Sequence, residues 1–360
     1  MDFGAKVMTR VNKTASFSPS VDLVVLGDIV ERFAGKRVVV LGDFVADAFQ
    51  FGDITRVSRE APVLILKHRE TQIVPGGGAN AANNFAALGA KVLPITAIGD
   101  DAAGDCLIGA FRENKVDVSG IVRVKGWTTP TKTRFLAGWA HTVGQQVLRV
   151  DYEPGEPLAE APRKKLARLL AAKIRSADAL AVSDYGFGVA TPEAVRGATS
   201  RAKREIPVTL DSRYQLHRYK NTGITSATPN EAEMEALHHT AIGSNLKELE
   251  RCGESTRETL KLKSLLVTRG RDGMALFQPG QKALHIPIHG SDQAVDVTGA
   301  GDTVLAAYTL GLASGASALE AAHLANIAGS LVVMKRGTAT VSREELLDAI
   351  RRAAVTGSGS

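Results

Sequence analysis

The sequence predicts an α/β protein in which helices flank a doubly wound, mostly parallel sheet, with a small β-sheet beside it. Short apolar runs alternate with longer amphipathic segments, which is typical of parallel strands joined by crossover helices. Two stretches, Phe49–His68 and Lys132–Tyr152, interrupt this alternation with strands and turns. The chain has 360 residues, which is enough for one large domain or two modest ones.

The first expected elements are a flexible tail over residues 1–20 and a helix over Val21–Phe33, with Ser20 as the N-cap. Residues 1–20 lack the apolar core of a signal peptide. The predicted apolar stripe of the helix consists of Val21, Val24, Val25, Ile29 and Phe33.

Further elements follow from apolar periodicity and from the glycines that punctuate it. The expected buried strands are Val38–Leu41, Val92–Ala97, Ala179–Ser183, Val208–Leu210 and Leu265–Thr268. The expected later helices are Leu158–Ser176, Gly301–Leu312, Leu319–Met334 and Arg343–Arg352. We expect the two irregular stretches, about 49–68 and 132–152, to pair as a β-sheet lid on a unit spanning 21–352. Residues 353–360 are expected to be a second flexible tail.

The composition excludes several classes of protein. The net charge of +6 is spread along the chain without basic–aromatic clustering, which argues against a nucleic-acid partner. No apolar run approaches the ~18 residues of a membrane span. Cys106 and Cys252 form no metal-ligand spacing, so a reducing, cytoplasmic setting is expected.

The segment Asp296–Thr303 (Asp-Val-Thr-Gly-Ala-Gly-Asp-Thr) carries the sharpest chemical pattern. Its small residues leave backbone N–H groups unobstructed just before an apolar helix, which makes an anion cradle. An acid inside such a cradle is explained if Asp302 takes the proton from a hydroxyl group that receives a phosphoryl group. The alternative is a glycine turn in which Asp302 only caps the helix.

A second glycine-rich segment, Pro75–Asn80, precedes the helical run Ala81–Leu88. Its three glycines would let a ligand approach the backbone closely, and Asn80 could bind a sugar hydroxyl. A linker turn is the alternative interpretation.

Carboxylates follow two predicted strands at the ends where ligands bind in open α/β sheets. Asp43 and Asp47 follow the strand Val38–Leu41, and Asp184 follows Ala179–Ser183. Each could hold sugar hydroxyls, and each could equally be an ordinary turn residue.

Two further segments have the composition of a nucleotide site. Asn230 and Glu233 lie one turn apart at a predicted helix start and could hold Mg²⁺ through water, although an acidic first turn explains them equally well. The segment Val267–Gly273 reads as a hairpin-like turn that could also contact a nucleotide. The chain contains neither the P-loop pattern nor a strand-GxGxxG-helix pattern.

Taken in order, these segments resemble the ribokinase-like (PfkB) carbohydrate kinases over roughly Lys36–Arg352. The resemblance implies ATP and Mg²⁺ as cofactors, a catalytic base at Asp302, and an anion hole at Gly299, Ala300 and Gly301. It implies that the sugar is bound by Asp47, Gly76, Gly77 and Asn80, with Asp184 in an analogous position. It places the nucleotide and its metal at Asn230, Glu233, Thr268, Gly270, Gly273 and Asn326, and K⁺ or another monovalent cation at Asp296.

Four further segments are similar to the heptose-phosphate kinase branch of that family: Arg56–Val63, Gln145–Asp151, Ser183–Gly186 and Asp296–Asp302. The resemblance implies phosphorylation of D-glycero-D-manno-heptose 7-phosphate at its anomeric hydroxyl, on the route to ADP-heptose. The sequence departs from that branch at Arg59, at Leu64-Ile65 and over Trp139–Gly144.

A phosphorylated sugar needs a cation under the lid, for which Arg56, Lys67 and Arg134 are candidates. We expect a homodimer through the lid, and we expect the nucleotidyltransferase half of bifunctional members to be absent. The alternatives are a kinase for another acceptor, such as fructose phosphate, ribose or a nucleoside, and a sugar- or nucleotide-binding protein without turnover.

Overall fold

The computed structural model describes residues 21–138, 145–213, 215–290 and 293–357. The predicted tail 1–20, the segment Trp139–Gly144 and residues 358–360 lie outside the described residues. Nine strands form one twisted sheet: β1 (Arg37–Gly42), β4 (Lys91–Gly99), β5 (Ile121–Val124), β8 (Ala179–Asp184), β9 (Val208–Ser212), β10 (Ser226–Ala227), β11 (Ser264–Thr268), β12 (Met274–Phe277) and β13 (Leu284–Ile286).

The order of this sheet is β13-β12-β11-β10-β9-β8-β1-β4-β5. All pairings from β11 to β5 are parallel, and β12 and β13 add an antiparallel edge. The five predicted strands are confirmed as β1, β4, β8, β9 and β11. The predicted hairpin after Thr268 is also confirmed, because β11 and β12 pair antiparallel across it.

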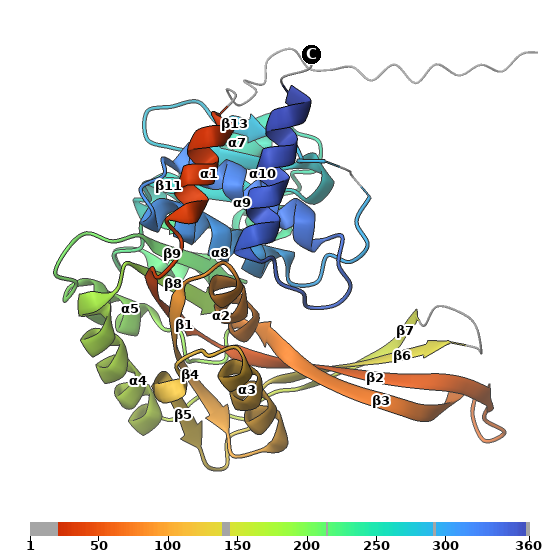
Figure 1. Ribbon diagram of the computed structural model, residues 1–360. Coiled ribbons are helices and arrows are strands. Elements are labelled where there is room, and N and C mark those ends of the chain that lie inside the picture. Colours follow the sequence, from red (N-terminus) through yellow and green to blue (C-terminus); the bar gives the residue numbers. More distant parts are fainter. Residues whose placement is uncertain (1–20, 139–144, 214, 291–292, 358–360) are drawn as a thin grey trace, which may run out of the picture.

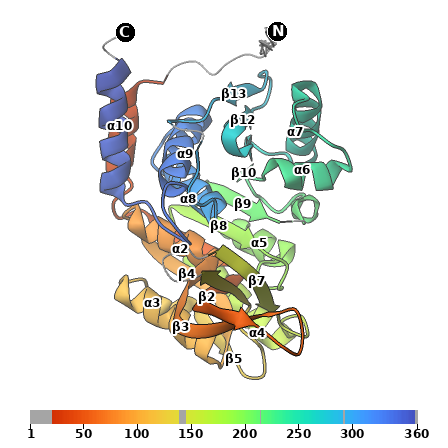
Figure 2. The same ribbon diagram turned by 90° about the vertical axis from the view of Figure 1, so that its right-hand side faces the viewer.

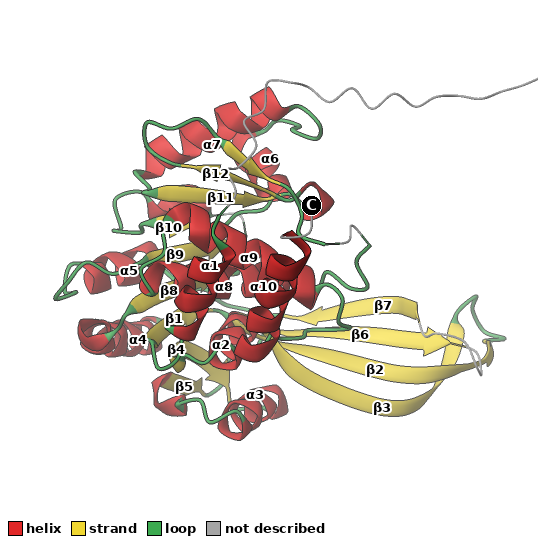
Figure 3. Ribbon diagram, turned by 45° about the horizontal axis from the view of Figure 1, so that its top comes forward, coloured by secondary structure: helices red, strands yellow, loops and turns green. Residues whose placement is uncertain are grey.

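Helices cover both faces of this sheet (Figures 1 and 3). The helices are α1 (Leu23–Glu31), α2 (Gly78–Ala87), α3 (Ala102–Glu113), α4 (Glu160–Lys173), α5 (Pro192–Thr199), α6 (Glu231–His238), α7 (Leu246–Leu260), α8 (Ala300–Ala313), α9 (Ala318–Val332) and α10 (Arg343–Gly357). None of the helices in these ranges is long and apolar enough to cross a membrane.

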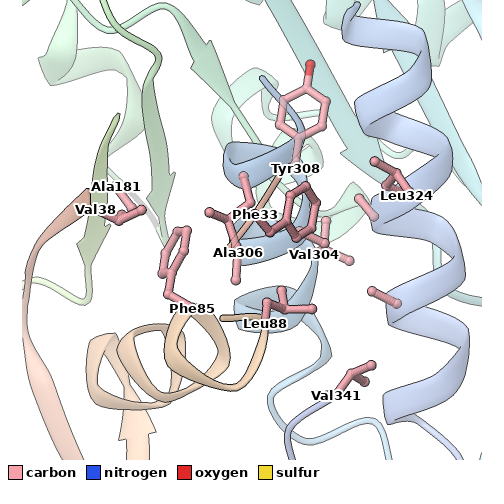
Figure 4. Close-up of a cluster of buried hydrophobic side chains, with 14 of the residues drawn as sticks. Phe33, Val38, Phe85, Leu88, Ala181, Val304, Ala306, Tyr308, Leu324 and Val341 are labelled. Carbon is pink, nitrogen blue, oxygen red and sulfur yellow. The ribbon is translucent and has the colours of Figure 1, made fainter. Parts of the chain in front are cut away.

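The alternation of side chains along β1 produces two hydrophobic cores. Val38 and Val40 pack into a core with α2, α8, α9 and α10, part of which Figure 4 shows around Phe85 and Tyr308. Val39 and Leu41 pack into a second core with α4, α5, α6 and α7. Both faces of β1 are therefore apolar, which explains its unbroken Val-Val-Val-Leu run.

The N-terminal helix differs from its prediction. Its N-cap is Asp22, whose carboxylate accepts the N–H of Val24 at 2.8 Å, while Ser20 lies outside the described residues. Val24 is 70% exposed and Val25 38% exposed, so the predicted stripe is wrong at both positions. The buried positions are Leu26, Ile29, Val30 and Phe33, which have the i, i+3, i+4, i+7 spacing of a core-facing helix. Figure 2 shows α1 side by side with α10.

The predicted lid is confirmed as a four-stranded sheet that projects from the body (Figure 1). It contains β2 (Phe44–Val57), β3 (Leu64–Gly77), β6 (Thr131–Gly138) and β7 (Gln145–Tyr152) in the order β3-β2-β6-β7. β2 pairs in parallel with β6, and two antiparallel pairs flank that contact.

The strands β2 and β3 are longer than the predicted 49–68 stretch. Their ladder begins at the pair Phe44 and Gly77. Gly76 and Gly77, which were predicted to lie in a turn, are consequently the last residues of a strand. At the other end of the chain α10 continues to Gly357, beyond Arg352, so residues 353–357 are helical and not a tail.

Candidate active site

A cavity of about 200 Å³ lies where the root of the lid meets the carboxyl ends of the parallel strands. This is the position at which open α/β sheets bind ligands. Its wall is lined by Asp47, Gly77, Lys132, Arg134, Tyr185, Asp211, Thr228, Asn230, Glu233, Thr268, Thr298, Gly299, Gly301, Asp302 and Thr338. The structure therefore brings together residues from all the segments with chemical patterns, although not every predicted residue.

Asp302 lies in the first turn of α8 and is only 4% exposed. Asn80 Nδ2 donates a hydrogen bond to its Oδ2 at 2.8 Å, and the hydroxyl of Tyr185 lies 3.5 Å from its Oδ1. Burial raises the pKa of Asp302 well above 3.8, against the opposing effect of the Asn80 hydrogen bond. The helix is capped by Gly299, so Asp302 is not a capping residue. A buried carboxyl group with a raised pKa has the properties of a general base.

The glycine loop before α8 has a tightly constrained backbone. Gly299 has a φ of +78°, and a Cβ atom there would lie 2.5 Å from Asn80 Nδ2. At Gly301 a Cβ atom would meet nothing within 4 Å. Since the first N–H groups of a helix have no intrahelical partner, the start of α8 presents donors and a positive dipole end to this wall of the cavity. This arrangement fits the predicted anion hole at Gly299 and Gly301, which line the cavity, whereas the N–H of Ala300 donates to the carbonyl oxygen of Val297 at 3.2 Å.

Asp47 anchors the lid side of the cavity and is 5% exposed. Its Oδ1 lies 2.6 Å from Arg134 Nη1, and Thr338 donates its hydroxyl to Oδ2 at 3.2 Å. A Cβ atom on Gly76 would lie 2.4 Å from the same carboxylate, so Gly76 provides the space that Asp47 occupies. Asp47 therefore lines the cavity. Gly76 does not line it, but its lack of a side chain leaves room for the Asp47 carboxylate.

The three cations predicted for a sugar phosphate have different places. Arg134 lines the cavity, but its charge is matched by Asp47. Arg56 and Lys67 are exposed on the outer part of the lid and do not line the cavity. The sequence missed Lys132, whose ammonium lies 5.1 Å from the ring centroid of Tyr185. Burial, followed by the nearby Arg213, lowers the pKa of Lys132.

Asn80 and Asp184, which the sequence predicts to bind the sugar, are both buried. The amide of Asn80 is fully buried against Asp302, and Asn84 donates to its carbonyl oxygen at 3.1 Å. Asp184 accepts hydrogen bonds from Tyr219 at 2.9 Å and from Ser212 at 3.1 Å, on the far side of the strand end. β8 remains paired with β9 through Asp184, which lies opposite Ser212. The Asp184 side chain is therefore held by Ser212 and Tyr219. Neither residue lines the cavity.

The opposite wall is formed by the start of α6. Asn230 Oδ1 accepts the N–H of Glu233 at 2.9 Å, and Glu233 Oε2 accepts the N–H of Asn230 at 2.9 Å. The two interpretations of this segment are thus compatible, because the pair forms a capping box and also lines the cavity. Thr268 bridges to Asn230 and lines the cavity as well.

Two carboxylates meet on this wall, Asp211 at the end of β9 and Glu233. Burial raises the pKa of both groups, and repulsion from Asp184 adds to the effect at Asp211, as repulsion from Asp211 does at Glu233. No group of three or more His, Cys, Asp or Glu side chains within the described ranges is arranged to hold a metal ion directly. These oxygen donors fit Mg²⁺ held largely through water and phosphate, which is its usual mode of binding.

The other predicted nucleotide residues, Gly270, Gly273 and Asn326, do not line the cavity, and neither does Asp296. A Cβ atom on Gly273 would lie 2.1 Å from the carbonyl oxygen of Ile286, so glycine is needed for the close approach of β13. Gly270 has a φ of +54° in the turn that precedes Gly273. Asn326 donates its amide to the carbonyl oxygen of Pro287 at 2.7 Å. Asp296 accepts the N–H groups of Thr298 and Gly337, and these bonds lower its pKa although burial opposes them.

Two cavity residues that were not predicted, Asp211 and Tyr185, have a signal in the sequence. Asp211 directly follows the predicted strand Val208–Leu210, which is the position that suggested Asp184 after its strand. Tyr185 is one residue beyond Asp184. Thr338 had no local signal, because it reaches Asp47 from 291 positions along the chain.

The fold and the cavity define a class of protein: an α/β unit with a buried carboxyl group at a helix start, beneath a β-sheet lid. The chain belongs to the pfkB family of carbohydrate kinases, whose model matches residues 36–345. It therefore carries the phosphotransferase unit that acts on sugar hydroxyl groups.

Among its relatives is the "Bifunctional protein HldE" of Trichlorobacter lovleyi, 37% identical over 333 residues, covering 91% of this chain and 66% of that protein. The protein of the same name from Geobacter sulfurreducens is 38% identical over 315 residues, covering 87% and 63%. The chain thus spans just under two thirds of the length of these relatives.

Two solved structures share the ribokinase-like fold. Arabidopsis thaliana ribokinase, complexed with ribose and ATP, superposes with a TM-score of 0.68 at 22% identity, covering 88% of this chain and 99% of that one. Escherichia coli phosphofructokinase-2, in complex with potassium, has a TM-score of 0.69 at 20% identity, covering 89% and 99%. At these identities the similarity concerns the fold.

Proposed function

We propose that this chain transfers the γ-phosphoryl group of ATP to the anomeric hydroxyl of D-glycero-D-manno-heptose 7-phosphate, with Asp302 as the general base. The observation that carries this proposal is the buried carboxyl of Asp302, with a raised pKa, at the start of a helix that opens on the cavity. Phosphoryl transfer depends mainly on alignment and charge neutralisation, and the proposal assigns both tasks to residues of this cavity.

In the proposed reaction the acceptor hydroxyl lies between Asp302 and the lid. Asp302 takes the proton of the hydroxyl as its oxygen attacks the γ-phosphorus, and the bond to the β-phosphate oxygen breaks to release ADP. The first N–H groups of α8, at Gly299, Ala300 and Gly301, stabilise the charge that spreads over the transferring group. Asp47 orients the acceptor from the lid side, and Lys132 adds a positive charge beside it.

The metal side of the proposal rests on the oxygen donors at the start of α6. Glu233 and Asn230, with Asp211 beside them, would hold Mg²⁺ through water, and the ion would neutralise charge on the ATP phosphates. Asn326, Gly270 and Gly273 would shape the neighbouring nucleotide groove. A monovalent cation such as K⁺ is proposed near Asp296.

Support for the heptose acceptor comes from the four segments that are similar to the heptose-phosphate kinase branch and from the relatives named HldE. Lys132 also supports this acceptor, because its ammonium group lines the cavity from the lid and could bind the phosphate of the sugar. A second candidate is another phosphorylated sugar, since the fold is shared with phosphofructokinase-2.

The proposal is tested by a panel of acceptors with ADP release as the readout. Heptose 7-phosphate should be the best substrate, ahead of fructose 6-phosphate, ribose and adenosine. Clear turnover of another sugar with none of heptose 7-phosphate would overturn the acceptor and leave the kinase. ATP binding without turnover of any acceptor would instead favour a binding protein.

We also propose that residues 21–352 act as one kinase unit in the cytoplasm and that the lid forms a homodimer. Exposed apolar side chains on the lid support the dimer, including Val57, Leu148 and Tyr152, each 55–56% exposed. Light scattering of the purified chain measures its mass in solution directly.

A further inference from the structure

Asp43 is a buried carboxylate that the proposed reaction does not use. It is fully buried, and it is the single residue between β1 of the body and β2 of the lid. The chain crosses between body and lid a second time where β3 ends and α2 begins, and there the N–H of Gly78 donates to the carbonyl oxygen of Asp43 at 3.1 Å. Asp43 therefore links the β1–β2 connection to the β3–α2 connection at the root of the lid.

The side chain of Asp43 is enclosed by the loop that follows β8. Its carboxylate accepts three backbone N–H groups, from Tyr185 at 2.9 Å, Phe187 at 3.0 Å and Val189 at 2.9 Å. These alternate N–H groups point to one centre because Gly186 and Gly188, between them, both have a φ of +88°. Converging backbone N–H groups form a concave site for an anion, and here the protein's own carboxylate occupies it.

This loop carries Tyr185 into the active site. The hydroxyl of Tyr185 lies 3.5 Å from Asp302 Oδ1, and its ring lies under the ammonium of Lys132. A Cβ atom on Gly77 would lie 3.2 Å from the same ring, so the end of β3 also fits against it. The position of Tyr185 therefore depends on the loop, and the loop encloses Asp43.

We infer that Asp43 is a positioning residue that locks the root of the lid to the 184–189 loop and thereby holds Tyr185 against the base Asp302. Two acceptor oxygens are essential to this role, because three N–H donors converge on them and an amide would turn an NH₂ group toward one of these donors. Burial, followed by repulsion from Asp184, raises the pKa of Asp43 to about 7, and the three N–H bonds oppose this rise. The inference rests on the proposed kinase function for its catalytic readout but not for its structural one.

The structural readout is amide hydrogen exchange of the wild-type protein followed by NMR. The amides of Tyr185, Phe187 and Val189 should exchange slowly although they lie in a loop, and Asp43→Asn should accelerate all three. Fast exchange of these amides in the wild type would overturn the inference, whether or not the variant folds. This measurement needs no substrate, so it stands even if the acceptor panel shows no turnover.

The catalytic readout is a double-mutant cycle with Tyr185→Phe. Asp43→Asn should lower kcat about 10²-fold through misplacement of active-site groups, with the KM for ATP unchanged. Tyr185→Phe should lower kcat about tenfold, the typical effect of one hydrogen bond to a charged group. The double variant should match Asp43→Asn alone, whereas effects that multiply would show that Asp43 does not act through Tyr185.

Asp101→Asn is the matched control. Asp101 accepts the N–H of Gly104 at 2.8 Å, and both the N–H and the hydroxyl of Thr129, at 2.8 and 2.7 Å, but it does not line the cavity. The same chemical change should lower the melting temperature there and leave kcat unchanged. If the two Asn variants lose stability and kcat alike, Asp43 has only a structural role and the inference fails.

Discussion

The strands of the body and of the lid differ in how much of their length is buried. β1 of the body is buried from Val38 to Gly42, with a hydrophobic core on each face. β2 of the lid is buried at its first residues and becomes exposed toward Val57. Asp47, which lines the cavity, lies in the buried first part of β2. Among the described residues, the cavity is therefore lined by the body and by the root of the lid.

The largest loss is expected from Asp302→Asn in the body. The variant keeps the shape of the side chain but cannot accept a proton, so turnover should fall by about 10²–10⁴, the usual contribution of a general base. ATP binding, measured by calorimetry, should be retained. Turnover close to that of the wild type would remove Asp302 from this role.

A smaller loss is expected from Gly299→Ala, which disturbs the anion hole without changing a charge. The new methyl group would meet Asn80 Nδ2, and the residue would keep a φ that side chains disfavour. We expect kcat to fall about 10²-fold, because small displacements of an aligned site have effects of that size. Gly109→Ala is the control, because a Cβ atom on this α3 residue meets nothing within 4 Å, and it should leave kcat unchanged.

Asp47→Asn tests the root of the lid. It leaves Arg134 with an unmatched, mostly buried charge and removes an acceptor for a sugar hydroxyl. The KM of the sugar should rise about tenfold or more, while the KM of ATP stays the same. An equal rise in both KM values would show that the lid does not act on the acceptor alone.

The smallest catalytic effect is expected at the exposed part of the lid. Leu148→Glu places a charge on β7, where Leu148 is 55% exposed. The mass in light scattering should fall from dimer to monomer, while the stability of the subunit should change by only about 0.5 kcal/mol. An unchanged mass would place the dimer contact elsewhere.

Local patterns were sufficient to predict five of the nine strands of the body, the lid and the location of Asp302 at a helix start, because each depends on neighbouring residues in the sequence. The buried stripe of α1 was mispredicted because it depends on which side of the helix α10 covers. The hydrogen bond from Asn80 to Asp302 spans 222 positions, and that between Thr338 and Asp47 spans 291. Such pairs are set by the topology, so no local motif could assign Asn80 to the base instead of the sugar.

Asp43 and Asp47 show the same limit within one short segment. Both carboxylates follow β1 in the chain, and the same possible roles were predicted for both. Their different environments come from distant segments, the loop after β8 for Asp43 and the residues Arg134 and Thr338 for Asp47.

The most direct test of the central claim is the pH dependence of kcat/KM for the sugar. An acid whose pKa is raised on folding stays protonated to a higher pH, so a base of this kind is active only above its raised pKa. Burial raises the pKa of Asp302, and the acidic limb should therefore lie well above 3.8. That limb should be absent from the residual activity of Asp302→Asn. A limb in the ordinary aspartate range, or one that persists unchanged in the variant, would contradict the assignment of Asp302 as the base.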